Sequence, residues 1–416
     1  MTAGTPPDAR EGTPDQRETS LERAAGWSFL LLAAALPWSI APMGIAAGLC
    51  AALTLAVWLR RPSRRPSTPV LWPALAWAAA LALSAAFALD REASLPRLTK
   101  ALFPLLVPLA ATHAGRPGRG RRALAVLLVS ATLAAAFGLV LYALHGAAWP
   151  NRARGAAGHY MTYGGQLVLW VTLAVAVLAL ERTRRWRGLA LVTALAGGLT
   201  LAATFTRSAW LGLAVALATL LGLARPRWLP ALAALLVLGL ALAPASIRER
   251  AWSAFDPSHP TNLQRTCMWR SGIAMFRDHP LTGVGTGGMK EIYDRYMLPG
   301  ATERAGHLHS VPVQILATMG LAGLAAFAWL YGSLFACAGL VPRPRSGLAA
   351  AVRLGVTALL VGFLVNGLFE WNFGDEELLY PLFTLAGIAW AARGWGVAAA
   401  AAPAAGDAPP APGPAR

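Results

Sequence analysis

Long apolar blocks separated by short polar segments dominate this chain. Segments 71–89, 123–144 and 228–244 contain almost no charged residue. A helix needs roughly 20 apolar residues to cross the hydrocarbon core of a bilayer, and several blocks reach that length. The apolar positions run continuously and do not alternate with polar ones at a short period, so a soluble globular domain is excluded.

The pattern predicts an all-α polytopic membrane protein with about twelve transmembrane helices. Nine spans are expected within 24–245 and three within 309–395. The predicted spans are 24–40, 42–59, 70–89, 96–113, 122–145, 163–180, 187–205, 208–224, 228–245, 309–338, 348–370 and 376–395. The polar segment 1–23 is interpreted as a disordered tail, and the Ala/Pro-rich segment 396–416 as a low-complexity tail.

Arginines gather in every second connection between these spans. Clusters follow spans two, four, six, eight and ten: Arg60, Arg61, Arg64 and Arg65; Arg116, Arg119, Arg121 and Arg122; Arg182, Arg184, Arg185 and Arg187; Arg225 and Arg227; Arg343 and Arg345. By the positive-inside rule these connections are cytoplasmic. Both termini are therefore predicted to be cytoplasmic, and segment 246–308 is predicted to lie outside.

Composition supports this interpretation. Hydrophobic residues make up 56% of the chain and charged residues 13%, whereas soluble domains carry about 25% charged residues. The formal charge of +17 is spread over the connections and forms no single patch, so we expect no nucleic-acid partner.

One external connection is unusually long. Segment 246–308 has roughly 60 residues, far more than an ordinary connection, and long loops on rigid scaffolds often carry function. Its stretch 262–276 has helical spacing of apolar residues. The glycine-rich run 283–288 lacks the strand and the lysine of a phosphate-binding loop, so it is interpreted as a tight turn.

The external residues favour a reaction without metal or nucleotide. Carboxylates are sparse outside, and no close pair could hold a metal on a nucleotide sugar. Arg207 sits in a very short external connection, where its charge must snorkel or pair. Arg265 and Trp269 are four residues apart on one helical face, which suits either substrate stacking or ordinary packing. His309 opens an apolar helix and is either a helix cap or a general base.

Three stretches together resemble the O-antigen ligase-like superfamily, which includes O-antigen ligases, O-antigen polymerases and protein O-oligosaccharyltransferases. The first is 206–211, with the sequence TRSAWL. The second begins with Arg265 and Trp269 and continues through the sequence MFRDHPLTGVG at 275–285. The third is 307–320, with the sequence HLHSVPVQILATMG, in which Ser310 and Thr318 replace the asparagine and glutamate common in the family.

The resemblance implies transfer of a glycan from undecaprenyl diphosphate to an acceptor at the periplasmic face of a Gram-negative inner membrane. It implies that Arg207 and Arg265 bind the diphosphate and that His309 is the general base. No cofactor and no metal are expected. Further candidate substrate-binding residues, each with an equally good structural interpretation, are Trp269, Arg152, Arg154, His307 and Gln314.

An O-antigen ligase that uses a lipid A–core acceptor is the preferred hypothesis. A polymerase often carries a second large external loop, whereas one long external connection is predicted here. A protein-glycosylating relative often carries a further soluble C-terminal region, whereas the predicted C-terminal segment is a short Ala/Pro-rich tail. A lipid-linked glycan transporter is the alternative from another class, but transporters tend to show two related halves, and none are evident here. The oligomeric state stays open.

Overall fold

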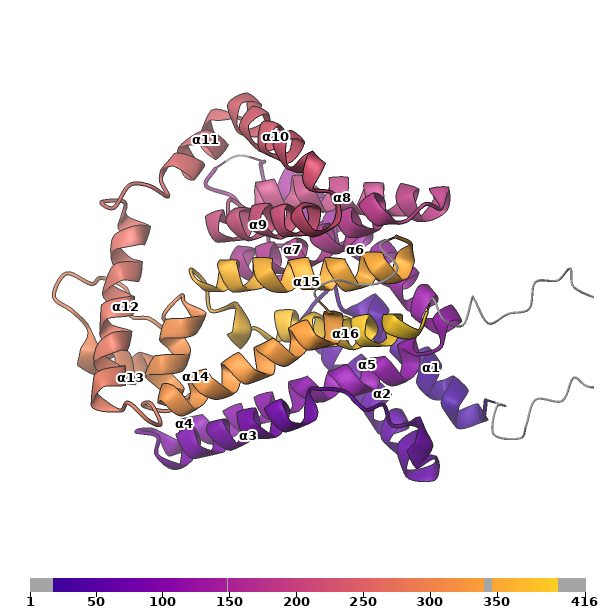
Figure 1. The fold of residues 1–416 in the computed structure, drawn as a ribbon. Coiled ribbons are helices and arrows are strands. Elements are labelled where there is room, and N and C mark those ends of the chain that lie inside the picture. The colour runs from indigo at the N-terminus through magenta and orange to yellow at the C-terminus, as the bar shows by residue number, and fades with distance from the viewer. Residues whose placement is uncertain (1–17, 148, 340–345, 396–416) are drawn as a thin grey trace, which may run out of the picture.

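The computed structural model describes residues 18–147, 149–339 and 346–395. Every regular element in these residues is an α- or 3-10 helix, which confirms the all-α prediction. Figure 1 shows the long helices running in similar directions as one bundle, with α12 (Pro260–Asp278) and α13 (Met289–Tyr296) across one end.

The order of elements follows the apolar blocks. The first half contains α1 (Ser20–Ala35), α2 (Ile40–Arg60), η1 (Pro62–Arg64), α3 (Leu71–Ala86), α4 (Arg91–Ser94), η2 (Leu95–Leu105), α5 (Leu106–Ala114), α6 (Pro117–Leu144), η3 (Gly155–Ala157), α7 (Tyr160–Leu180), α8 (Arg184–Ala203) and α9 (Arg207–Ala224). The second half contains η4 (Pro226–Trp228), α10 (Leu229–Leu242), α11 (Ala245–Trp252), α12, α13, α14 (Val311–Ala338), α15 (Leu348–Gly367), η5 (Asn372–Gly374), α16 (Glu376–Ala391) and η6 (Ala392–Gly394).

Seven of the described helices are long and apolar enough to cross a membrane, and the bent pair α10–α11 would make eight. Helices α1, α3 and α16 align with predicted spans but have 16 residues each. The structure therefore confirms a polytopic membrane protein, while the number twelve stays a prediction.

Two predicted spans differ from straight α-helices. The segment predicted as span four begins as the 3-10 helix η2 and becomes α-helical only at α5. The segment predicted as span nine ends at Leu242, and the chain turns by 117° into α11. Pro244 explains this break, because a residue before proline avoids helical dihedrals, and Ala243 is extended at φ −65° and ψ 150°.

The two ends of the described chain lie on the same face of the bundle. Glu18 pairs with Arg116 at 2.7 Å, and Glu22 pairs with Arg64 at 3.0 Å. The indole N–H of Trp395 donates to the carbonyl oxygen of Ala114, the last residue of α5, at 2.8 Å. Helix α1 begins at Ser20, inside the segment 1–23 that was predicted as a disordered tail. The rest of that tail, residues 1–17, lies outside the described residues, as do the predicted tail 396–416 and Arg343 and Arg345.

The glycine-rich run braces a break in α14. Gly320 interrupts that helix at φ 61° and ψ −156°. The amide of Val284 donates to Ala317 O at 2.9 Å, and the amide of Gly285 donates to Thr318 O at 3.1 Å. A Cβ on Gly283 would lie 2.2 Å from the carbonyl carbon of Thr318, so only glycine fits there. The run is thus a packed turn that joins the long loop to the bundle.

Candidate active site

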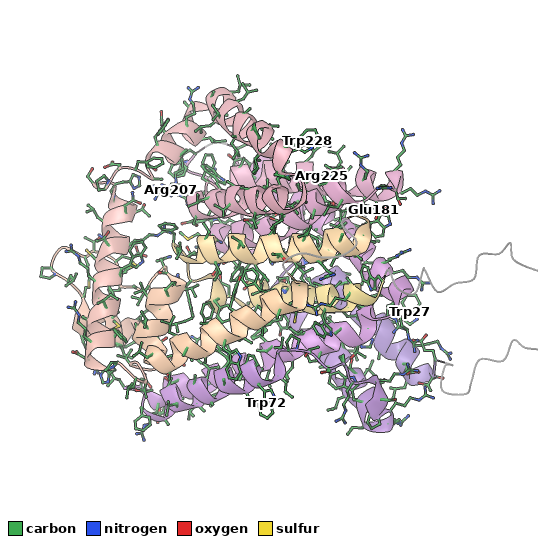
Figure 2. The ribbon with its side chains drawn as sticks, viewed as in Figure 1. Trp27, Trp72, Glu181, Arg207, Arg225 and Trp228 are labelled. Carbon is green, nitrogen blue, oxygen red and sulfur yellow. The ribbon has the colours of Figure 1, made fainter. Side chains whose placement is uncertain are left out.

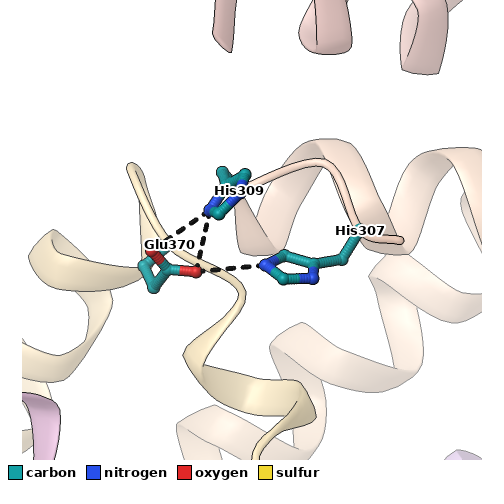
Figure 3. Close-up of side chains that lie close together, drawn as sticks. All are labelled: His307, His309 and Glu370. Carbon is teal, nitrogen blue, oxygen red and sulfur yellow. Dashed lines mark hydrogen bonds and ion pairs between the residues drawn. The ribbon is translucent and has the colours of Figure 1, made fainter. Parts of the chain in front are cut away.

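Two histidines and one glutamate meet at the end of the bundle beneath α12. Nδ1 of His309 lies 3.0 Å and 3.2 Å from the two carboxylate oxygens of Glu370. Nε2 of His307 lies 3.4 Å from Oε1 of the same carboxylate. Figure 3 shows the two rings converging on Glu370 from the loop that leads into α14, while Glu370 follows the end of α15.

The backbone holds this cluster in an unusual conformation. His309 has φ 46°, and Phe205, just before Arg207, has φ 50°. In the described part of the chain these two are the non-glycine residues with positive φ. Such dihedrals cost about 1–3 kcal/mol each and concentrate at functional sites. Both occur beside residues that the sequence singles out.

The carboxylate is buried and strongly stabilised as an anion. Glu370 is 5% exposed. Burial raises its pKa, but the hydrogen bonds from the rings of His307 and His309 outweigh burial and hold the pKa well below its usual range. Burial in turn lowers the pKa of His307, and the hydrogen bond and charge of Glu370 outweigh that effect and raise it.

This geometry suits His309 as a base. The carboxylate accepts from Nδ1–H, so the other ring nitrogen carries the free lone pair. A carboxylate in this position fixes the tautomer of the ring and stabilises the imidazolium that forms after proton transfer. The pair therefore has the parts of an oriented general base.

The two predicted arginines line one pocket of about 570 Å³. Its walls include two guanidinium groups and several apolar side chains: Arg207, Leu211, Phe255, Arg265, Trp269 and Phe369. Arg265 also lies 3.5 Å from Oε2 of Glu370, which links the pocket to the histidine cluster. Guanidinium groups beside an apolar wall suit a ligand with a phosphate head and a lipid tail.

The Arg207 side chain is held from two sides. NH1 donates to Ser253 Oγ and NH2 donates to Asn262 Oδ1, each at 2.9 Å. Figure 2 shows Arg207 at the end of the bundle near α12, with Arg225 and Glu181 farther toward the opposite end. Fixed in this way, Arg207 has little conformational entropy left to lose when it binds an anion.

Apart from Trp269, the other residues predicted to bind substrate lie outside the arginine pocket. Arg152 stacks over the rings of Trp149 and Tyr160, at 4.7 Å and 4.1 Å from their centroids. Neither Arg152 nor Arg154 lines the arginine pocket. Oε1 of Gln314 accepts from the amide of Leu308 at 2.7 Å, so Gln314 braces the histidine segment.

His307, His309 and Glu370 also form the described cluster that could hold a metal ion, with donor atoms within 4.8 Å of one another. A two-nitrogen, one-oxygen donor set is typical of zinc sites. Here, however, the guanidinium of Arg265 lies against the same carboxylate. That positive charge opposes a dication at this point, and the expectation of no metal stays a prediction.

Glu370 was not predicted from the sequence as a site residue. It lies at the end of a predicted span, where no role was assigned to it. A lone carboxylate at the end of an apolar span is itself a signal, because an ionisable group there is costly unless it is paired. Ser253 and Asn262, which hold Arg207, were missed as well and carry no comparable signal.

Comparison with protein families identifies one region of the chain. Residues 190–328 match the family model described as O-antigen ligase. This region, about a third of the chain, is similar to that family. The match spans Arg207, Arg265 and His309, whereas Glu370 follows it. It confirms the resemblance to the O-antigen ligase and polymerase superfamily, whose members act on lipid-linked glycans. A search of curated proteins found no match.

Proposed function

We propose that this protein is an O-antigen ligase, which moves a glycan from undecaprenyl diphosphate to a lipid A–core sugar. The proposal rests on the position of Glu370 between the histidine cluster and the arginine pocket. This carboxylate contacts His309, the proposed base, and Arg265, which lines the arginine pocket. Base and diphosphate-binding groups are then neighbours, as a single displacement requires.

The donor would occupy the arginine pocket. Arg207 and Arg265 would neutralise the diphosphate, which becomes a better leaving group as its developing charge is stabilised. Leu211 is 45% exposed and Phe255 79% exposed, so the apolar wall continues to the outer surface of the bundle. The prenyl chain would leave the pocket along these side chains into lipid.

The acceptor hydroxyl would give its proton to the free ring nitrogen of His309 as its oxygen attacks the anomeric carbon. The bond from that carbon to the phosphate oxygen breaks, and undecaprenyl diphosphate leaves with the electron pair. One displacement inverts the anomeric carbon. Glu370 stabilises the imidazolium during the step. The sugar–diphosphate bond supplies the free energy, so no nucleotide is needed.

The arginine clusters support a periplasmic position for the proposed active site. The histidine cluster precedes α14, which begins at the end of the bundle where α12 lies, whereas α1, which contains Glu22, lies toward the opposite end (Figure 1). If those arginines are cytoplasmic, the site opens to the periplasm of a Gram-negative inner membrane.

The test is a transfer assay with purified protein in proteoliposomes and undecaprenyl-diphosphate glycan, with and without lipid A–core. Glycosylated lipid A–core, formed only when that acceptor is present, supports the ligase. Longer carrier-linked glycans without it would replace the ligase by a polymerase. Glycan movement across the bilayer without a new glycosidic bond would overturn the enzyme proposal.

A further inference from the structure

A second pocket, of about 400 Å³, lies against the histidine cluster. Its lining combines positive, aromatic and histidine side chains: Trp77, Arg97, Lys100, Lys290, His307 and Trp371. It shares no lining residue with the arginine pocket. Glu370 joins the two pockets, because it contacts His307 in the wall of one and Arg265 in the wall of the other.

The cations come from two separate elements. Arg97 and Lys100 belong to the 3-10 helix η2, which runs for 11 residues. Residues three apart lie in line on a 3-10 helix, and runs longer than 3–4 residues are uncommon. The geometry of η2 therefore stacks Arg97 above Lys100, and Lys290 from α13 joins them at the pocket.

The acidic residues of the pocket do not fully offset these cations. The lining includes Asp375 and Glu291 against Arg97, Lys100 and Lys290. Asp375 accepts a hydrogen bond from Thr162 Oγ1 at 2.8 Å, so a neighbouring side chain partly occupies it. A negatively charged group would complete the charge balance of the pocket.

The aromatic side chains show that a ligand of this pocket also needs an apolar face. Trp77 and Trp371 line the pocket beside the charged groups, giving it apolar faces together with convergent polar groups. Pyranose rings present such a mixture, with a C–H face and a rim of hydroxyls. A purely aliphatic lipid would leave the cations without a partner, which disfavours it as the occupant.

We propose that this second pocket binds the saccharide end of the acceptor, and that Arg97 and Lys290 bind a negatively charged substituent on it. The proposal rests on the proposed function and specifies its acceptor. The donor would approach the histidine cluster from the arginine pocket and the acceptor hydroxyl from the other side. Entry from two sides gives the in-line geometry that a single displacement needs.

The test is a direct binding measurement, which does not depend on turnover. Lipid A–core is titrated into purified protein in nanodiscs, using the wild type and the variants Arg97→Gln and Lys290→Gln. Both side chains are exposed, so these substitutions leave the packing intact. Arg295→Gln, on the same helix α13 but outside this pocket, is the matched control.

The proposal predicts that each pocket variant weakens acceptor binding about tenfold, as expected for loss of a hydrogen bond to a charged group. The control variant and the donor affinity should stay unchanged. Lys290→Arg should keep most of the binding. Wild-type affinity in both pocket variants, or no saturable binding to the wild type, would overturn the proposal.

Two modified acceptors identify the anion. One lacks its phosphate groups and the other has its carboxylates reduced to alcohols. If removal of the phosphates weakens binding to the wild type and abolishes the effect of Arg97→Gln, the pocket recognises a phosphate. If reduction of the carboxylates has these effects, it recognises a carboxylate. Equal wild-type affinity for a fully neutral acceptor would contradict the proposal. Transfer by the wild type is measured separately, so a protein that binds acceptor but forms no glycosidic bond would refute only the proposed function.

Discussion

Replacement of Glu370 by glutamine isolates the contribution of the buried carboxylate. Glutamine keeps the size of the side chain and an oxygen for Nδ1–H of His309, but it removes the negative charge. In the wild type, the carboxylate oxygens of Glu370 lie 3.0 Å and 3.2 Å from Nδ1 of His309 and 3.5 Å from the guanidinium of Arg265. The imidazolium formed in the reaction would lose its counter-charge.

The size of the effect follows from those contacts. A hydrogen bond to a charged group contributes about 1.5–3 kcal/mol, and about 1.4 kcal/mol corresponds to a tenfold change in rate. We therefore expect kcat to fall about 10- to 100-fold. KM for the donor should change less, because the arginines stay in place. Initial rates of glycan transfer in proteoliposomes measure both constants.

Two controls make this prediction sharp. Glu376→Gln changes a neighbouring carboxylate at the start of α16 and should leave kcat unchanged. In a His309→Ala background, Glu370→Gln should add little further loss, because the carboxylate acts through the ring. A folded Glu370→Gln variant with kcat within about twofold of wild type would refute the proposed role of the pair.

Four other outcomes are expected. His309→Ala should abolish transfer with normal membrane insertion, and retained activity in the same assay would exclude it as the base. Arg265→Lys should lose about tenfold or more in transfer rate, since lysine keeps the charge without the two-pronged donor geometry; full activity would make Arg265 structural only. EDTA should leave the rate unchanged, and a loss restored by a divalent cation would indicate a metal. Burial raises the pKa of Asp375 to about 6 from 3.8, so the native state binds this proton more tightly than the unfolded state. Stability should therefore fall as pH rises from about 4 to about 6. Thermal melts of Asp375→Asn should lack this part of the decline, and an identical pH dependence would contradict it.

Much of the helical framework is predictable from local sequence. Apolar blocks must bury their backbone polar groups within helices, and each predicted span corresponds to helical structure in the described residues. Arg207 and His309 can be predicted from sequence because a charged or titratable group beside an apolar helix is costly unless it is paired or functional. Arg265 was predicted from its helical spacing to Trp269 and from the family resemblance. The structure places Arg207 and Arg265 on one pocket.

The features that escaped prediction depend on residues distant in sequence. Glu370 is 61 residues from His309, so nothing local shows their contact. The break at Gly320 is compensated by backbone hydrogen bonds between residues 280–285 and α14, which connect two separate elements. Hydropathy alone does not register such tertiary contacts.

The most direct test of the central claim is a balance of both products in proteoliposomes with wild-type protein, undecaprenyl-diphosphate glycan and lipid A–core. The account predicts one undecaprenyl diphosphate released for each glycan joined to lipid A–core, with inversion of the anomeric carbon. Both products should vanish in His309→Ala. Glycan transfer with retention of configuration, or carrier release without a new glycosidic bond, would contradict the account.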